Sequence, residues 1–307
     1  MFQLKLTYDS IIIGGGPAGL SAALQALRAG LNILIVEKES TGGTINYTDT
    51  INNYLGISKI SGFELASNMF NHVAGLGPQI IFGEAVQADL KCATKKIIVE
   101  SCQTQQEFLA KSIIIAVGLS RRKLHCPGSN LDGVSYCALC SGCLYQGENA
   151  AVVGGGDSAA ESALYLSNIC AEVTLIVRKA KLSCNQTLEK QLKQKNNINI
   201  LFNHEIKEIQ GDGRAERIEF KGSRGCLKVS CVFVNIGQEP RTNIFDGIDT
   251  NEKGYFLADE KMQTNIEGVF VAGDCVAKEL RQIATAVSDG SIASYSALKF
   301  LANSSLK

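Results

Sequence analysis

The chain has 307 residues, of which 45% are hydrophobic and 20% charged, a composition typical of a globular protein with more than one domain. Lysine plus arginine balance aspartate plus glutamate at 30 each, so no excess positive charge is present for binding nucleic acid or an anionic membrane surface. The first ten residues lack the apolar core of a signal peptide, and no apolar run is long enough to span a bilayer, so we expect a cytoplasmic protein. The eleven cysteines are an odd number, and we expect most of these thiols to be reduced.

The first predicted unit covers residues 10–38 and has the order strand, glycine-rich turn, helix, strand. This order is typical of the βαβ unit that binds a dinucleotide. Its turn has the pattern G-x-G-x-x-G, formed by Gly14, Gly16 and Gly19. The first glycine permits the tight turn, the second lets the backbone approach a pyrophosphate, and the third lets helix and strand pack closely. The phosphates would bind the free N–H groups at the helix N-terminus.

The second strand of this unit ends at Glu37, 23 residues after Gly14. A carboxylate at this position can accept hydrogen bonds from the hydroxyls of an adenosine ribose that has no 2′-phosphate. A further apolar strand is predicted within residues 110–117 and is followed by Gly118, where we expect the first domain to end and a second domain to begin.

The next notable stretch is VSYCALCSGC, in which Cys137, Cys140 and Cys143 are spaced as C-x-x-C-x-x-C. This spacing is compatible with a redox disulfide, with half of a metal site, or with incidental thiols in a reducing compartment. For the cysteines outside this cluster, such as Cys170 and Cys231, we expect small buried apolar residues.

Residues 150–178 repeat residues 10–38 without a gap at an offset of 140 residues. The repeat predicts a second dinucleotide-binding βαβ unit, with a G-x-G-x-x-A turn formed by Gly154, Gly156 and Ala159. The position equivalent to Glu37 is Val177, and Arg178 and Lys179 follow it. The lost carboxylate and the two added cations favour a 2′-phosphate, and therefore NADP over NAD, although a solvated strand end would look the same.

Two more strands are predicted near the C-terminus. The first lies within residues 231–242 and ends the territory of the second repeat, and the second lies within residues 264–275 and ends in Gly273-Asp274. The expected fold is therefore α/β, with two Rossmann-like dinucleotide-binding domains, the second domain being inserted into the first. We expect the outer domain to comprise residues 1–117 and 243–307, and the inserted NAD(P)-type domain to comprise residues 118–242.

The sequence resembles the low-molecular-weight thioredoxin reductases, which are FAD-dependent pyridine nucleotide-disulfide oxidoreductases. The resemblance covers nearly the whole chain and is carried by motifs in the order and spacing of that family. These motifs are GGGPAG, the GG at 42–43, NNYLG, the C-x-x-C, GGGDSA, GVFVAGD and RQIATA.

The resemblance implies that the outer domain, residues 1–117 and 243–307, is the FAD-binding domain and that the inserted domain, residues 118–242, is the NADP-binding domain. It also implies which residues bind the cofactors. The FAD contacts would be Gly14, Gly16, Pro17, Ala18, Gly19, Glu37, Gly43, Asn53, Gly273, Asp274, Arg281, Gln282 and Ile283. The NADPH contacts would be Gly154, Gly156, Asp157, Ser158, Ala159, Arg178 and Lys179.

The resemblance also implies an activity and partners. A homodimer would pass electrons from NADPH through FAD to a Cys137–Cys140 disulfide and then to a thioredoxin. Cys140 would face the flavin and Cys137 would attack thioredoxin. The inserted domain would rotate about linkers near Gly118 and Pro240.

The sequence departs from the family at the residue after the C-x-x-C, where Ser141 replaces an acid that donates a proton. A serine hydroxyl is a poor proton donor at neutral pH. Ser183 stands in place of the last arginine of the phosphate-binding stretch, and Lys181 compensates only as a point charge. These changes leave three alternatives open: ferredoxin as donor, an oxygen-dependent dithiol oxidase, or a flavin-bound redox sensor without enzymatic activity.

The resemblance favours a redox disulfide over a metal site at the cysteine cluster. A zinc site needs a second pair of ligands at matching spacing, and His72, His125 and His204 are not paired in this way, so we expect no metal. Cys143 is expected to pack as an apolar thiol, with a resolving or regulatory role as the alternative.

Overall fold

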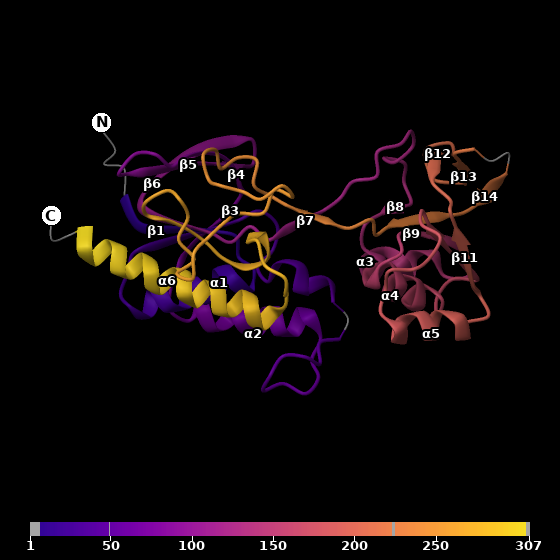
Figure 1. Ribbon diagram of the computed structural model, residues 1–307, viewed down its shortest axis with the longest axis horizontal. Coiled ribbons are helices and arrows are strands. Elements are labelled where there is room, and N and C mark those ends of the chain that lie inside the picture. The colour runs from indigo at the N-terminus through magenta and orange to yellow at the C-terminus, as the bar shows by residue number, and fades with distance from the viewer. Residues whose placement is uncertain (1–6, 49, 223–224, 305–307) are drawn as a thin grey trace. The chain divides into compact units, whose positions relative to one another are not determined.

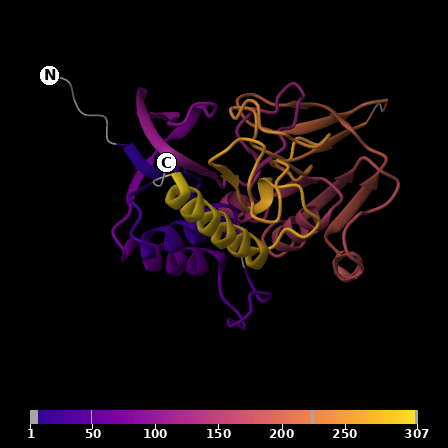
Figure 2. The same ribbon diagram turned by 60° about the vertical axis from the view of Figure 1, so that its left-hand side comes forward.

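The computed structural model describes residues 7–48, 50–222 and 225–304, which fold as two compact units. Unit 1 is drawn from Met1–Ser120 and Glu239–Lys307, and unit 2 from Arg121–Gln238. Figure 1 shows the two units with their elements labelled, and Figure 2 shows them from a second direction.

A seven-stranded sheet forms the centre of unit 1, with the order β3-β2-β1-β6-β5-β4 and with β17 paired to β6. Its strands are β1 (Thr7–Ile13), β2 (Ile33–Glu37), β3 (Gln79–Phe82), β4 (Glu84–Asp89), β5 (Lys95–Ser101), β6 (Thr104–Ile115) and β17 (Val269–Val271). The strands β3, β2, β1, β6 and β17 run parallel, whereas β4, β5 and β6 form an antiparallel meander. Successive side chains of β1 point to opposite faces, so Ile11 and Ile13 enter one core and Ile12 the other.

Helices cover one face of this sheet. They are α1 (Pro17–Arg28), α2 (Gly62–Ala74) and α6 (Ile283–Ser304), and two 3₁₀ turns, η1 (Gly43–Tyr47) and η3 (Gly273–Cys275), complete the unit. Both views show α6, in yellow, running alongside α1. The two helices approach so closely that a Cβ on Gly290 would lie 2.0 Å from the carbonyl oxygen of Ala18. Ser61 caps α2 by accepting a hydrogen bond from the backbone N–H of Glu64 at 3.2 Å.

Unit 2 has a parallel five-stranded sheet with the order β11-β10-β9-β15-β8. These strands are β8 (Val134–Ser135), β9 (Asn149–Val153), β10 (Glu172–Val177), β11 (Ile198–Phe202) and β15 (Cys231–Val234). One face packs against α4 (Asp157–Leu166) and α5 (Gln186–Gln194), with α3 (Ala138–Ser141) and the 3₁₀ turn η2 (Gly142–Tyr145) nearby. The other face packs against an antiparallel sheet of β12 (Ile206–Gln210), β13 (Arg217–Phe220) and β14 (Cys226–Lys228).

The two segments that connect the units pair with each other as β7 (Leu119–Arg121) and β16 (Gln238–Pro240). The hydroxyl of Ser120 donates to the carbonyl of Glu239 at 3.2 Å, and the N–H of Arg122 donates to the carbonyl of Gly237 at 3.0 Å. The chain therefore enters and leaves unit 2 through neighbouring strands.

The expected α/β class with two Rossmann-like sheets is confirmed. Within the described residues, no helix is both long enough and apolar enough to cross a membrane.

Candidate active site

The first glycine-rich turn joins β1 to α1 in unit 1. Gly14 has a φ of +108°, and a Cβ there would lie 2.3 Å from the carbonyl oxygen of Ala116, so only glycine fits. A Cβ on Gly19 would lie 1.8 Å from the carbonyl oxygen of Gly14, which is the close helix–strand contact that the sequence predicts. Gly16 is the N-cap of α1, and a Cβ added to it would meet nothing within 4 Å. The start of α1, with Pro17 as its first residue, therefore leaves room for a phosphate to reach the backbone N–H groups.

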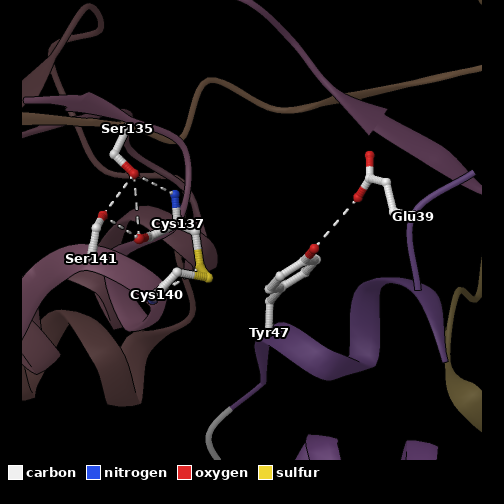
Figure 3. The surroundings of a disulfide bond; sticks show 6 residues. All are labelled: Glu39, Tyr47, Ser135, Cys137, Cys140 and Ser141. Carbon is white, nitrogen blue, oxygen red and sulfur yellow. Dashed lines mark hydrogen bonds between the residues drawn. A yellow bond between two sulfur atoms is a disulfide. The ribbon is translucent and has the colours of Figure 1, made fainter. Parts of the chain in front are cut away.

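Glu37 lies directly beneath this turn at the end of β2, with an exposed fraction of only 9%. Its Oε2 accepts a hydrogen bond from the N–H of Gly15 at 2.6 Å, and its Oε1 accepts from the N–H of Glu39 at 2.8 Å. A carboxylate oxygen can accept two hydrogen bonds, so each oxygen keeps capacity for a ribose hydroxyl. Glu37 thus holds the turn in addition to the binding role that the sequence predicts. Glu39 also accepts a hydrogen bond from the hydroxyl of Tyr47 at 3.4 Å (Figure 3).

The turn η3 brings Asp274 to the same end of the sheet, since a Cβ on Gly273 would lie 2.9 Å from the Cβ of Ala18. Asp274 Oδ1 is buried and has no hydrogen-bond partner among the described residues. Burial raises the pKa of the Asp274 carboxyl, while Lys278 and Arg281 act in the opposite direction. A buried acceptor without a partner costs free energy, so this oxygen is suited to receive a hydroxyl from a ligand.

A partly buried ion pair holds the backbone of η3 in place. Asp289 of α6 accepts hydrogen bonds at Oδ2 from the N–H of Gly273 at 3.0 Å and from the ammonium of Lys278 at 2.5 Å. The sequence did not mark Asp289 as part of the site, because its contact with Gly273 depends on how α6 packs.

The guanidinium of Arg281 makes hydrogen bonds and a ring contact within the protein. Its guanidinium donates to the carbonyls of Asp274 at 3.2 Å and Val276 at 3.3 Å, and it stacks 4.2 Å from the centre of the Tyr255 ring. Further candidates lie elsewhere in unit 1. Gly43 starts η1 against Gly16, Ile283 packs with the cluster around Ile45, and Asn53 and Gln282 are exposed.

The second glycine-rich turn joins β9 to α4 in unit 2. Gly154 has a φ of +143°, and a Cβ there would lie 2.1 Å from the carbonyl oxygen of Asn235, which reproduces the geometry of Gly14. Gly156 is the N-cap of α4, and Ala159 is fully buried behind the turn. Asp157 Oδ1 accepts from the backbone N–H of Asn185 at 2.7 Å, so the side chain fixes the following loop, while Ser158 is exposed.

Arg178 and Lys179 follow directly after β10, and both side chains are exposed. The carbonyl of Lys179 accepts a hydrogen bond from the N–H of Asn203 at 3.2 Å, which aligns this strand end with the segment that carries Glu205. The hydrogen bond from Lys221 lowers the pKa of the Glu205 carboxyl, and the charge of Arg178 lowers it further. Glu205 is therefore a carboxylate close to the cations that would hold a 2′-phosphate.

Ser183 is turned toward the glycine-rich turn of unit 2. Its hydroxyl donates to the carbonyl of Gly155 at 3.1 Å, and its N–H donates to the same oxygen at 2.7 Å. The residue that stands in place of an arginine thus closes the loop onto the turn and adds no positive charge.

Cys137 and Cys140 form a disulfide, with their Cα atoms 5.3 Å apart (Figure 3). Cys137 is the N-cap of α3, and its Sγ accepts a hydrogen bond from the N–H of Cys140 at 3.1 Å. Cys140 is exposed. The pair that the resemblance implies is therefore confirmed as a disulfide that solvent can reach.

Two serine hydroxyls flank Cys137. Ser141 Oγ lies 2.9 Å from Ser135 Oγ and 3.1 Å from the carbonyl oxygen of Cys137, and the N–H of Cys137 donates to Ser135 Oγ at 3.2 Å. Ser141 stands at the position where the family resemblance led us to expect an acid, and its hydroxyl contacts the carbonyl of Cys137 and the hydroxyl of Ser135. Ser135, at the end of β8, carries no signal in the sequence that marks it as part of the site.

The remaining cysteines divide by their place in the fold. Cys170, Cys231 and Cys275 are buried, as expected for small apolar residues, and burial raises the pKa of the Cys275 thiol to about 12. The same expectation is wrong for Cys92, Cys102 and Cys226, which are exposed in turns or on the strand β14.

Cys143 does not pack as an apolar thiol either, because it is exposed. Its neighbour Gly142 takes the buried position, where a Cβ would lie 2.8 Å from Leu166. Over the described ranges, no group of three or more His, Cys, Asp or Glu side chains is placed to hold a metal ion.

Comparison with known proteins gives a consistent result. The pyridine nucleotide-disulphide oxidoreductase family matches residues 8–290. The thioredoxin reductase of Ureaplasma parvum is 40% identical over 303 residues, covering 96% of this chain and 97% of that protein. The thioredoxin reductase of Bacillus subtilis is 36% identical over 298 residues, covering 94% of this chain and 93% of that protein. The crystal structure of Lactococcus lactis thioredoxin reductase superimposes with a TM-score of 0.88 at 36% identity, covering 97% of this chain and 100% of that one.

Proposed function

The chain belongs to the pyridine nucleotide-disulphide oxidoreductase family, and within it to the low-molecular-weight thioredoxin reductases, and from that premise we propose that it carries electrons from NADPH through FAD to the Cys137–Cys140 disulfide and on to a thioredoxin. The observation that carries the proposal is the disulfide itself, in a unit that also has a dinucleotide-binding turn. The family implies binding of a flavin and a nicotinamide nucleotide, and the proposal specifies FAD and NADPH.

The residues of unit 1 fit FAD. The open position at Gly16 would admit a pyrophosphate, the Glu37 carboxylate would accept ribose hydroxyls, and the unpartnered oxygen of Asp274 would accept a hydroxyl of the ribityl chain. FAD, when bound, supplies a centre that accepts a hydride and releases two electrons to a disulfide. Unit 1 would therefore be the FAD-binding domain; its parts, Met1–Ser120 and Glu239–Lys307, extend a few residues beyond the expected 1–117 and 243–307.

The residues of unit 2 fit NADPH. Val177 stands where a carboxylate would select NADH, Arg178 and Lys179 follow it, and Gly156 opens α4 toward a pyrophosphate. The negative charge of Glu205 and the serine in place of an arginine at position 183 reduce the positive charge of this site. Arg178 and Lys179 still leave it positively charged. The NADP-binding domain would comprise residues 118–242.

The chemistry assigns different tasks to the two cysteines. Two electrons and one proton open the disulfide to one thiol and one thiolate. Cys137 would attack the thioredoxin disulfide as a thiolate, and Cys140 would then attack the mixed disulfide and regenerate the Cys137–Cys140 bond. The reduced thioredoxin leaves as a dithiol after taking up one more proton. We extend the proposal to a cytoplasmic homodimer.

An anaerobic titration of the flavoprotein with NADPH, NADH and reduced ferredoxin, side by side, tests the donor. NADPH should bleach the flavin absorbance at lower concentration than NADH. Bleaching by ferredoxin alone would overturn the donor assignment. Formation of hydrogen peroxide with a small dithiol, in the absence of thioredoxin turnover, would indicate a dithiol oxidase.

A further inference from the structure

The hydroxyls of Ser135 and Ser141 connect both polar backbone groups of Cys137. The N–H of Cys137 donates to Ser135 Oγ at 3.2 Å, and its carbonyl accepts from Ser141 Oγ at 3.1 Å and from the N–H of Ser141 at 3.3 Å. The two hydroxyls lie 2.9 Å from each other, and Ser135 Oγ lies 3.4 Å from the same carbonyl (Figure 3).

The two hydroxyls have few protons to donate. Each serine has one hydroxyl proton and two lone pairs. If Ser141 donates to the carbonyl of Cys137, Ser135 donates to Ser141 and accepts from the N–H of Cys137. This assignment uses both hydroxyl protons on oxygen atoms, so neither is directed at a sulfur. The hydroxyl of Ser141 is also far too weak an acid to protonate a thiolate at neutral pH.

We propose that Ser135 and Ser141 act together as positioning residues for Cys137, holding its backbone so that its sulfur stays at the N–H of Cys140 when the disulfide opens. The proposal rests on the assignment of Cys137 as the thiol that attacks thioredoxin. Ser141 would thus serve the reaction through orientation, in place of proton donation, and the proton would come from water.

Local structure explains why Cys137 needs such support. It precedes a helix of only four residues, α3, and follows β8, which has only two residues. Neither element fixes its backbone strongly, because short elements make few hydrogen bonds of their own. In the disulfide form the N–H of Cys140 donates to the sulfur of Cys137 at 3.1 Å, and a donor kept at this place after the disulfide opens would favour the thiolate over the thiol. That effect requires the sulfur to remain in place, which is what the two serines provide.

The test is the pH dependence of alkylation of Cys137 in full-length flavoprotein that carries Cys140→Ser, so that Cys137 has no disulfide partner. Labelling is read by mass spectrometry at Cys137 itself, because Cys92, Cys102, Cys143 and Cys226 are also exposed thiols. Ser135→Ala and Ser141→Ala should each raise the pKa of Cys137 by about half to one unit. The double variant should shift it no further than the larger single shift, because both hydroxyls serve one arrangement. Ser141→Thr, which restores the hydroxyl, should return the original curve.

Ser167→Ala is the matched control, because it also removes a hydroxyl that donates to a backbone carbonyl in unit 2, that of Leu164 at 2.7 Å. It should leave the Cys137 curve unchanged. An unchanged curve in Ser141→Ala overturns the proposal, as does a fully additive double variant. If Ser135→Ala fails to fold, Ser141→Ala and Ser141→Thr still decide. Bleaching of the flavin by NADPH in the unmodified protein is measured separately, so failure of the electron pathway is distinguished from failure of the positioning role.

Discussion

The Cα of Gly14 faces the carbonyl oxygen of Ala116 so closely that a Cβ on residue 14 would lie 2.3 Å from that oxygen. This contact joins the first glycine-rich turn to the end of β6. The contact therefore ties the position of the turn to the core of the sheet.

Gly14→Ala should abolish flavin retention and lower the thermal midpoint, because backbone must shift to relieve the contact. Gly30→Ala is the matched control, since Gly30 has a φ of +78° but a Cβ added to it would meet nothing within 4 Å. It should cost only about 1–2 kcal/mol for the left-handed backbone and keep the flavin. The flavin-to-protein absorbance ratio after gel filtration separates the two. Equal retention by both variants would contradict the steric argument.

Asp274→Asn should raise the stability of the flavin-free protein and lower its affinity for FAD. Burial raises the pKa of Asp274 above its unfolded value. The group therefore contributes stability that is present below the unfolded pKa and lost as pH rises through the folded pKa. At neutral pH the buried charge destabilises, and asparagine removes it. Loss of a charged hydrogen-bond acceptor for FAD should weaken binding roughly tenfold.

Thermal unfolding of the flavin-free protein across acidic to neutral pH, together with FAD titration, measures both effects. The wild type should gain stability on acidification through the Asp274 pKa, relative to Asp274→Asn. Asp246→Asn, at an exposed aspartate of unit 1, is the control and should change neither quantity. An Asp274→Asn protein that is less stable without flavin would show that the burial argument is incorrect.

Arg178→Ala should raise the KM for NADPH about tenfold or more while leaving the KM for NADH nearly unchanged, because only NADPH has the 2′-phosphate. Glu205→Gln should act in the opposite direction and lower the KM for NADPH roughly two- to threefold, since it removes a carboxylate near Arg178 on an exposed surface. Steady-state kinetics with both nucleotides give the answer. Lys228→Ala, an exposed lysine on β14, should behave as wild type. Parallel changes for both nucleotides would point away from a 2′-phosphate site.

Cys137→Ser should abolish reduction of thioredoxin while NADPH still bleaches the flavin. The electron pathway into the flavin does not require the disulfide, whereas thioredoxin reduction does. Cys143→Ser, at an exposed thiol outside the disulfide, should retain turnover. Anaerobic absorbance and a thioredoxin-coupled assay on the same samples make the comparison. Turnover by Cys137→Ser would exclude its proposed role.

Alkylation of the oxidised native protein should modify Cys92, Cys102, Cys143 and Cys226 and spare Cys170, Cys231 and Cys275. Reaction requires an accessible thiolate, and burial raises the pKa of both Cys231 and Cys275. Mass spectrometry of peptides after labelling, with a denatured sample as the control, identifies the sites. Rapid native labelling of Cys275 would show that unit 1 opens locally.

The two glycine-rich turns could be predicted because their requirements are local. Gly14 and Gly154 need a positive φ and close approach of backbone, and only glycine offers both, so the pattern is visible in the sequence. The order strand, glycine-rich turn, helix and strand occurs twice in the sequence, which is why the α/β class was predictable.

The contacts of Ser135 and Asp289 could not be predicted in this way. Asp289 contacts Gly273 only because α6 packs against η3. Ser135 makes a local contact with the N–H two residues further along the chain, but serines make such contacts in many turns that have no role in a site. Serine and aspartate occur in many environments, so their identity alone does not mark a role. Ser183 is similar, because its hydrogen bond to Gly155 depends on the path of a loop.

The pairing of β17 with β6 has a consequence for how the chain folds during synthesis. Val269 pairs with Ile113, a sequence separation of 156 residues, so unit 1 has a high contact order. All of unit 2 leaves the ribosome before β17 does. Once unit 2 has folded and β7 has paired with β16, its two ends are held about one strand spacing apart. The folded inserted unit then keeps the two parts of unit 1 close together. This removes most of the loop-closure entropy that opposes the pairing of β17 with β6.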